Sequence, residues 1–182
     1  MGWRGAAWIF AVPPRYPRWM TGSDPLFEGL GEQDGIELVQ RTPLFHSLNF
    51  DETRRLFRAA RLERREAGAT IVEANAIGEA LYIVKEGTVR VVRDGTVLGA
   101  LGAGELFGEM SLVDDLFTSA SVEAETDVEL IVVPRAAFEL LIASDLGLAV
   151  KVYRAFCRTL SDRLRRANVF LPAEQRLRHA VQ

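Results

Sequence analysis

The sequence predicts a mainly β domain with helices at both ends, in which short antiparallel strands close into a roll or a sandwich. Between Leu62 and Val133, short runs of β-branched residues alternate with glycines, which is typical of many short strands. Asp94-Gly95 separates two of these runs and is a strong hairpin signal, because both turn positions need positive φ. The regular spacing of the runs favours a closed arrangement over an open sheet.

Residues 1–34 are predicted to form a disordered or loosely ordered extension. Met1–Met20 mixes tryptophan, arginine and proline, and its apolar run Gly5–Val12 is too short to cross a bilayer. We expect Met20 to be a natural start. A weak interfacial anchor is the alternative interpretation.

Residues 35–143 are predicted to form the roll and its entry helices. A short helix is expected at Ile36–Gln40, followed by a break at Thr42-Pro43. Asn49 and Glu52 have the spacing of a capping box, which predicts a second short helix. The expected strands are Thr70–Val72, Leu81–Val84, Thr88–Arg93, Thr96–Leu101, Ser119–Ala124 and Val128–Val133.

Residues 144–182 are predicted to form a long helix and a short tail helix, after a short helix at Ala136–Ile142. Apolar residues recur along the long helix at steps of three and four, and we call them the apolar seam: Val150, Tyr153, Cys157, Leu160, Leu164 and Ala167. The seam either packs back on the roll or pairs with a second copy. Both interpretations stay open.

The composition is that of one soluble domain, with 182 residues, 48% of them hydrophobic. A net charge of -3 removes the general attraction on which sequence-independent nucleic-acid binding depends. Cys157 is the single cysteine, which excludes an internal disulfide and favours a reducing, cytoplasmic location. We expect no membrane span.

One stretch carries binding chemistry: it runs from Gly102 to Leu112 and continues at residues 118–122. Free backbone N–H groups at a helix start bind anions, and a glycine before them lets a ligand approach. Glu109 lies beside this site and would repel a bare phosphate, so it is better suited to accept hydrogen bonds from hydroxyl groups. A sugar phosphate fits this pair of features.

From about Leu38 to Ala167 the sequence resembles the cyclic nucleotide-binding domain family, which includes cyclic-AMP receptor proteins and kinase regulatory subunits. Phe107-Gly108-Glu109-Met110-Ser111-Leu112 matches the phosphate-binding cassette. The family's roll glycines and aromatic residue, and its entry helix, match Gly68, Gly78, Tyr82, Gly87, Gly104 and Leu44-Phe45. The resemblance implies a stand-alone antiparallel double-stranded β-roll, jelly-roll-like, with helices at both ends.

The resemblance also implies roles for single residues. Glu109 would accept a hydrogen bond from the ribose 2′-hydroxyl, although a surface acid that caps its own turn is the alternative. The other expected ligand-binding residues are Gly108, Met110, Ser111, Thr118, Ser119, Ala120 and Ser121. Leu98, Leu106 and Phe107 would line the pocket.

One departure from the family pattern concerns the charge in the pocket. The cassette arginine that would pair with the cyclic phosphate is replaced by Thr118, and the proline before it by Phe117. Losing one partner of a buried charge pair costs roughly 2–5 kcal/mol, so cyclic AMP or cyclic GMP is expected to bind weakly or not at all. The Thr118 hydroxyl could still donate one hydrogen bond. A replacement cation would have to come from Arg90, Arg93 or the helix beyond Val150.

No enzyme is predicted, and no tightly bound cofactor or metal. His46 and His179 both lie outside the β region. Cys157 has no histidine near it in sequence and is interpreted as a buried small hydrophobe of the apolar seam. Direct DNA binding is not expected, because the arginines at 163, 165 and 166 are interpreted as a solvated helix end. The chain is therefore interpreted as a regulatory sensor that acts through a protein partner or a dimer mate. The alternative is a degenerate roll that no longer binds ligand and serves as an interaction scaffold.

Overall fold

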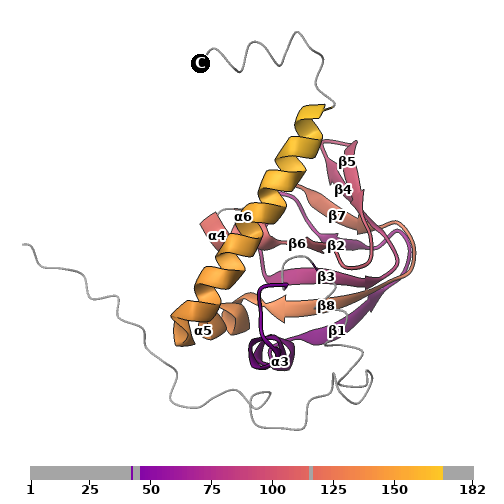
Figure 1. The fold of residues 1–182 in the computed structure, drawn as a ribbon. Helices are drawn as coiled ribbons and strands as arrows, with labels where there is room; N and C mark the ends of the chain where they lie inside the picture. Colours follow the sequence, from indigo (N-terminus) through magenta and orange to yellow (C-terminus); the bar gives the residue numbers. More distant parts are fainter. Residues whose placement is uncertain (1–41, 43–45, 115–116, 170–182) are drawn as a thin grey trace, which may run out of the picture.

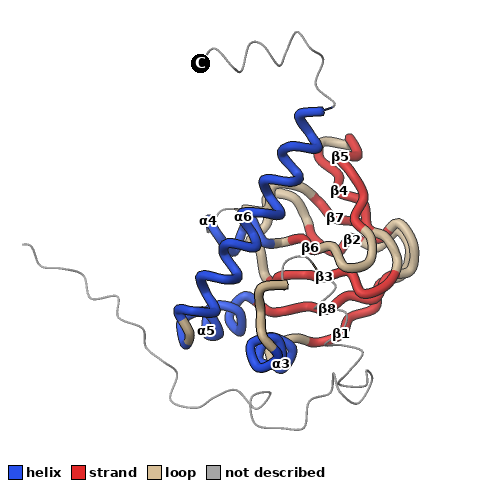
Figure 2. The backbone as a smooth tube through the Cα atoms, in the orientation of Figure 1, coloured by secondary structure: helices blue, strands red, loops and turns tan. Residues whose placement is uncertain are grey.

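The computed structural model describes residues 42, 46–114 and 117–169, and Figure 1 shows their arrangement. The helix expected at 36–40, the entry motif at 44–45, the extension 1–34 and the tail helix lie outside the described residues. Within them, two four-stranded antiparallel sheets form a β-roll, and helices cover one side of it (Figure 2). The predicted fold class is confirmed.

The two sheets divide the strands between them. One sheet has the order β1-β8-β3-β6 and the other β2-β7-β4-β5. The strands are β1 (Arg61–Arg65), β2 (Thr70–Val72), β3 (Ala80–Glu86), β4 (Val89–Arg93), β5 (Thr96–Leu101), β6 (Leu106–Phe107), β7 (Ser121–Ala124) and β8 (Val128–Pro134). Asp94 and Gly95 have positive φ, so the predicted hairpin between β4 and β5 is confirmed.

Alternation along the strands divides the core into two apolar clusters, one on each face of the first sheet. In β3, Leu81 and Ile83 face the helices, whereas Val84 faces the interior of the roll. The same division in β8 leaves both faces of that strand buried. The helices are therefore joined to the roll by a continuous hydrophobic core.

A short helix, α3 (Phe50–Arg58), packs at one end of the roll. The Asn49 side chain accepts a hydrogen bond from the Glu52 backbone N–H at 2.9 Å, and the Glu52 carboxylate accepts one from the Asn49 backbone N–H at 2.8 Å. The predicted capping box is therefore confirmed. Lys151 donates to both carboxylate oxygens of Glu52, at 2.7 and 2.8 Å. This ion pair ties α3 to the long helix described next.

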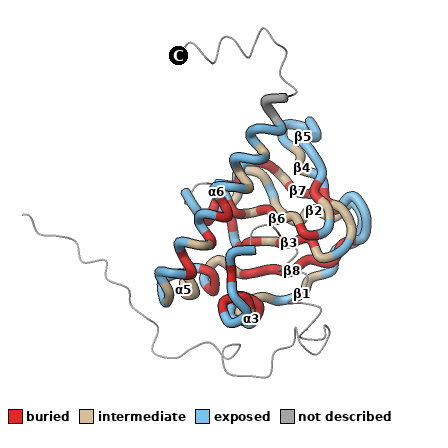
Figure 3. Tube along the Cα trace, in the orientation of Figure 1, coloured by how far each residue is buried: buried red, intermediate tan, exposed pale blue. Residues whose placement is uncertain are grey.

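Three more helices are described: α4 (Glu109–Asp114) lies between β6 and β7, and α5 (Arg135–Ser144) and α6 (Leu146–Val169) follow β8. The start of α6 is buried against the core through Leu148, Val152 and Phe156, which are all less than 2% exposed. Beyond Phe156 the helix crosses toward β5 and is mostly exposed (Figure 3). Within the described ranges, none of the helices has both the length and the hydropathy needed to cross a membrane.

The apolar seam does not pack back on the roll. Val150, Tyr153 and Leu164 are exposed, Leu160 is half-buried, and the neighbouring face of α6 makes the core contacts instead. Cys157 is also exposed, so interpreting it as a buried small hydrophobe was wrong. The side chain of Ala167 lies outside the described part. Pairing of the seam with a second copy stays a prediction.

Candidate functional site

A pocket of about 410 Å³ lies between the second sheet (β2, β7, β4 and β5), the β6–α4 turn and the C-terminal half of α6. This volume is within the roughly 300–1,000 Å³ range of small-molecule sites. The lining residues are Val72, Val91, Leu98, Gly99, Ala100, Leu101, Glu105, Phe107, Gly108, Glu109, Met110, Ser111, Thr118, Ser119, Ala120, Val122, Arg163 and Arg166.

Gly108 shapes the turn that carries the chain from β6 into α4. Its φ is +87°, and an added Cβ would lie 2.5 Å from the Ala80 carbonyl oxygen, so no other residue fits without a shift of the backbone. The Ser111 hydroxyl donates to the Gly108 carbonyl at 3.1 Å and closes the turn. This geometry places Glu109 at the first position of α4, directed inward.

Glu109 is 2% exposed, so interpreting it as a surface acid that caps its own turn was wrong. Its Oε1 accepts a hydrogen bond from Nη1 of Arg163 on α6 at 2.5 Å. The same guanidinium donates to the Leu106 carbonyl. Burial raises the pKa of the Glu109 carboxyl above its ordinary value, and the positive charge of Arg163 offsets part of that rise.

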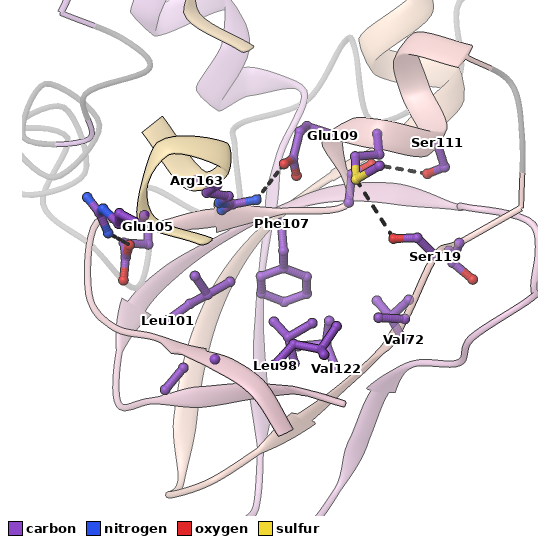
Figure 4. A pocket seen from close by; sticks show the side chains of 18 residues that line it. Val72, Leu98, Leu101, Glu105, Phe107, Glu109, Ser111, Ser119, Val122 and Arg163 are labelled. Carbon is purple, nitrogen blue, oxygen red and sulfur yellow. Dashed lines mark hydrogen bonds and ion pairs between the residues drawn. The ribbon is translucent and has the colours of Figure 1, made fainter. Parts of the chain in front are cut away.

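Arg163 therefore corrects the interpretation of the helix end as a solvated basic face. Its side chain is 32% exposed and points into the pocket (Figure 4). Arg166 also lines the pocket and lies 3.8 Å from Glu105, whereas Arg165 is exposed and pairs with Asp162. The helix beyond Val150, which was one of the expected sources of a replacement cation, thus forms one wall of the site.

Thr118 lines the pocket, but its hydroxyl already has partners. It donates to the Glu73 carbonyl at 2.5 Å and accepts from the Ala76 backbone N–H at 3.0 Å. The side chain thus holds the turn that contains Asn75, whose φ of +59° lies in the left-handed region. The expectation that this hydroxyl would donate to a ligand does not fit the structure.

The other predicted site residues divide into two groups. Gly108, Met110, Ser111, Ser119, Ala120, Leu98 and Phe107 line the pocket with Glu109 and Thr118. Ser121 and Leu106 do not: the Ser121 hydroxyl accepts from the Ala74 backbone at 3.0 Å, and the Leu106 side chain belongs to the core under the helices. The two-residue strand β6 turns Phe107 into the roll and Leu106 away from it.

The pocket has two chemically different sides (Figure 4). Leu98, Leu101, Phe107 and Val122 form an apolar side that can receive a flat ring. Glu109 and Arg163 form a polar side that offers an acceptor for hydroxyl groups and a cation for an anion. Across the described ranges, no cluster of three or more histidine, cysteine or acidic side chains could hold a metal ion.

The strand cations considered as replacements for the cassette arginine lie elsewhere. Arg90 pairs with Glu123 at 2.7 Å and Arg93 lies 3.7 Å from Asp94, and neither lines the pocket. Sequence reasoning named the helix beyond Val150 but missed Arg163. A usable signal was present, because Arg163 follows the buried Phe156 by seven residues and so falls on the same face of α6.

The chain is similar to known proteins over its β-roll. Residues 62–145 match the model of the cyclic nucleotide-binding domain, and the β-roll of this chain belongs to that family. The chain is 30% identical over 105 residues to a cGMP-dependent protein kinase of Caenorhabditis elegans, and the match covers 58% of this chain and 14% of the kinase. It is 38% identical over 109 residues to the cyclic AMP receptor protein of Thermus thermophilus, and the match covers 57% of this chain and 50% of the receptor protein.

A similar solved structure is the regulatory subunit of a cAMP-independent protein kinase A from Trypanosoma brucei. Its TM-score is 0.60 at 28% identity, and the match covers 68% of this chain and 45% of that one. This chain therefore spans half or less of these three relatives. What is shared is the fold of the cyclic nucleotide-binding domain.

Proposed function

We propose that this chain is a ligand-sensing regulatory module, whose pocket takes a cyclic nucleotide and whose α6 helix transmits the state of the pocket. The observation that carries this proposal is the Glu109–Arg163 ion pair, which joins the base of the pocket to α6 at 2.5 Å. Any ligand that engages Glu109 changes the surroundings of Arg163. Binding and the position of α6 are then coupled by a direct contact.

The chemistry of the pocket supports a cyclic nucleotide as the ligand. The apolar side suits a purine ring, Glu109 suits a ribose hydroxyl, and the two arginines of α6 suit a phosphate. The relatives named for cyclic GMP and cyclic AMP support this choice. The absence of an arginine at 118 argues for weaker binding than a complete cassette would give.

The burial pattern of α6 supports its role as the moving part. Its first half is fixed by core contacts and by the Lys151–Glu52 ion pair. In its second half, the ion pairs to the roll are those of Arg163 and Arg166 within the described residues. A ligand can shift the equilibrium between two positions of α6 only by as much as its affinities for those two positions differ. The ion pairs of Arg163 and Arg166 therefore set how strongly α6 responds to the ligand.

Amide hydrogen exchange with and without saturating cyclic AMP tests this proposal. We expect slower exchange in two separate segments, residues 106–122 and residues 157–166, with α3 as the unaffected internal control. An effect confined to residues 106–122 would contradict the role of α6. Unchanged exchange throughout would favour the alternative, a roll that no longer binds ligand and acts as an interaction scaffold.

The exposed apolar seam is the proposed output surface, either for a second copy or for a partner protein. Its residues have the three-and-four spacing of a helix-pairing interface, and Val150, Tyr153, Cys157 and Leu164 are exposed. Leu164→Asp is expected to convert a dimer to a monomer in sedimentation velocity, because Leu164 is 62% exposed and a buried charge would disrupt pairing. Arg158→Asp, at an exposed position on the side of α6 that carries no seam residue, is the control. A monomeric wild type would remove the dimer and leave a partner protein.

A further inference from the structure

The charges that line the pocket are distributed unevenly between the roll and α6. Glu105 and Glu109 come from the roll, and Arg163 and Arg166 come from α6. Position 118 is neutral, and its hydroxyl is engaged by the turn beside it. Among the described residues, the cations that line the pocket therefore all belong to the helix.

Of the two arginines, Arg163 has the closer and more buried contacts. It lies 2.5 Å from a carboxylate that is 2% exposed, whereas Arg166 lies 3.8 Å from its partner and is 74% exposed. An arginine carries five N–H donors in a planar fork, and the contacts to Glu109 and the Leu106 carbonyl use two of its nitrogens. The guanidinium therefore has further N–H groups with which to bind an oxygen anion in the pocket that it lines.

A ligand must compete for Glu109 with this ion pair. A neutral nucleoside that donates a hydroxyl to Glu109 displaces or weakens the contact and gives Arg163 no new partner. A cyclic nucleotide replaces the lost carboxylate with its own phosphate, so that the cation stays paired. The phosphate also escapes repulsion from Glu109 only where a cation lies between the two anions.

We propose that Arg163 is the residue that selects a cyclic nucleotide over the neutral nucleoside. When a cyclic nucleotide binds, Arg163 leaves Glu109 and pairs with the phosphate, and Glu109 accepts a hydrogen bond from a sugar hydroxyl in place of Arg163. This inference rests on the proposed function and names the anion selectivity of the same pocket. It assigns to α6 the phosphate-pairing charge that Thr118 lacks.

Calorimetric titration of the full chain with cyclic AMP and with adenosine tests the exchange. The wild type is expected to prefer cyclic AMP, and Arg163→Gln is expected to lower that preference, the ratio of the two Kd values, by about tenfold or more. Arg165→Gln is the matched control, because it removes the same charge from the same helix outside the pocket. Its ratio should equal that of the wild type.

A second measurement needs no variant. In the wild type, raising the salt concentration should weaken cyclic AMP binding relative to adenosine binding, since both ligands displace the Glu109–Arg163 pair but only cyclic AMP forms a new charge pair in its place. Equal ratios in the wild type and Arg163→Gln, or tighter binding of adenosine by the wild type, would overturn the exchange. Failure of all the proteins to bind either ligand would instead reject the proposed function, and this inference with it.

Discussion

Replacing Glu109 by glutamine is expected to weaken cyclic nucleotide binding by roughly 30-fold, because a hydrogen bond from the sugar hydroxyl to a charged acceptor is worth about 1.5–3 kcal/mol. Glutamine keeps the size of the side chain but replaces the charged acceptor of the sugar hydroxyl by a neutral amide. Calorimetric titration measures the change. Glu125→Gln, at an exposed loop position, is the control and should bind as the wild type does.

The same carboxyl predicts how binding depends on pH. Burial raises the pKa of Glu109, against the opposing charge of Arg163, so its proton is held at a higher pH than in an exposed glutamate. The ionised form accepts the sugar hydroxyl, so affinity should be full above this raised pKa and fall as the pH drops through it. Glu109→Gln should lack this dependence. A wild-type affinity that does not change with pH over this range would contradict the role of the ionised carboxylate.

Phe156→Ala is expected to lower the free energy of unfolding by about 3–5 kcal/mol, the usual cost of removing a buried phenylalanine side chain. The ring is 1% exposed and stacks 5.9 Å from Phe138 of α5, so its loss opens a cavity where α6 meets the core. Urea denaturation measures the change. Leu164→Ala on the exposed side of α6 is the control and should cost far less; equal losses for the two variants would contradict the described packing.

The order of most strands and helices along the chain could be predicted because the sequence signals for them are local. Alternating β-branched runs, the Asp94-Gly95 turn and the Asn49–Glu52 capping box each specify structure within a few residues. β1 was missed because Arg61–Arg65 contains a single aliphatic residue and looks like a charged surface segment. It becomes a strand by pairing with the buried β8, and that partner lies about 65 residues away in sequence.

The pocket could be predicted only on the side that the cassette forms. Glu109 and the residues around Gly108 are close in sequence, so their common role could be inferred from one motif. Arg163 lies 54 residues beyond Glu109 on a separate helix, and its direction depends on which face of α6 packs on the core. The sequence carries two apolar stripes on α6, and the prediction followed the exposed one.

The measurement that tests the central claim most directly is calorimetric titration of the wild-type chain with cyclic AMP and cyclic GMP. Saturable binding of one or both, at a stoichiometry of about one per chain, is the predicted result for a pocket with Glu109 and Arg163 at its polar side. No heat with either ligand at millimolar concentration would contradict the sensor and leave the roll as an interaction scaffold.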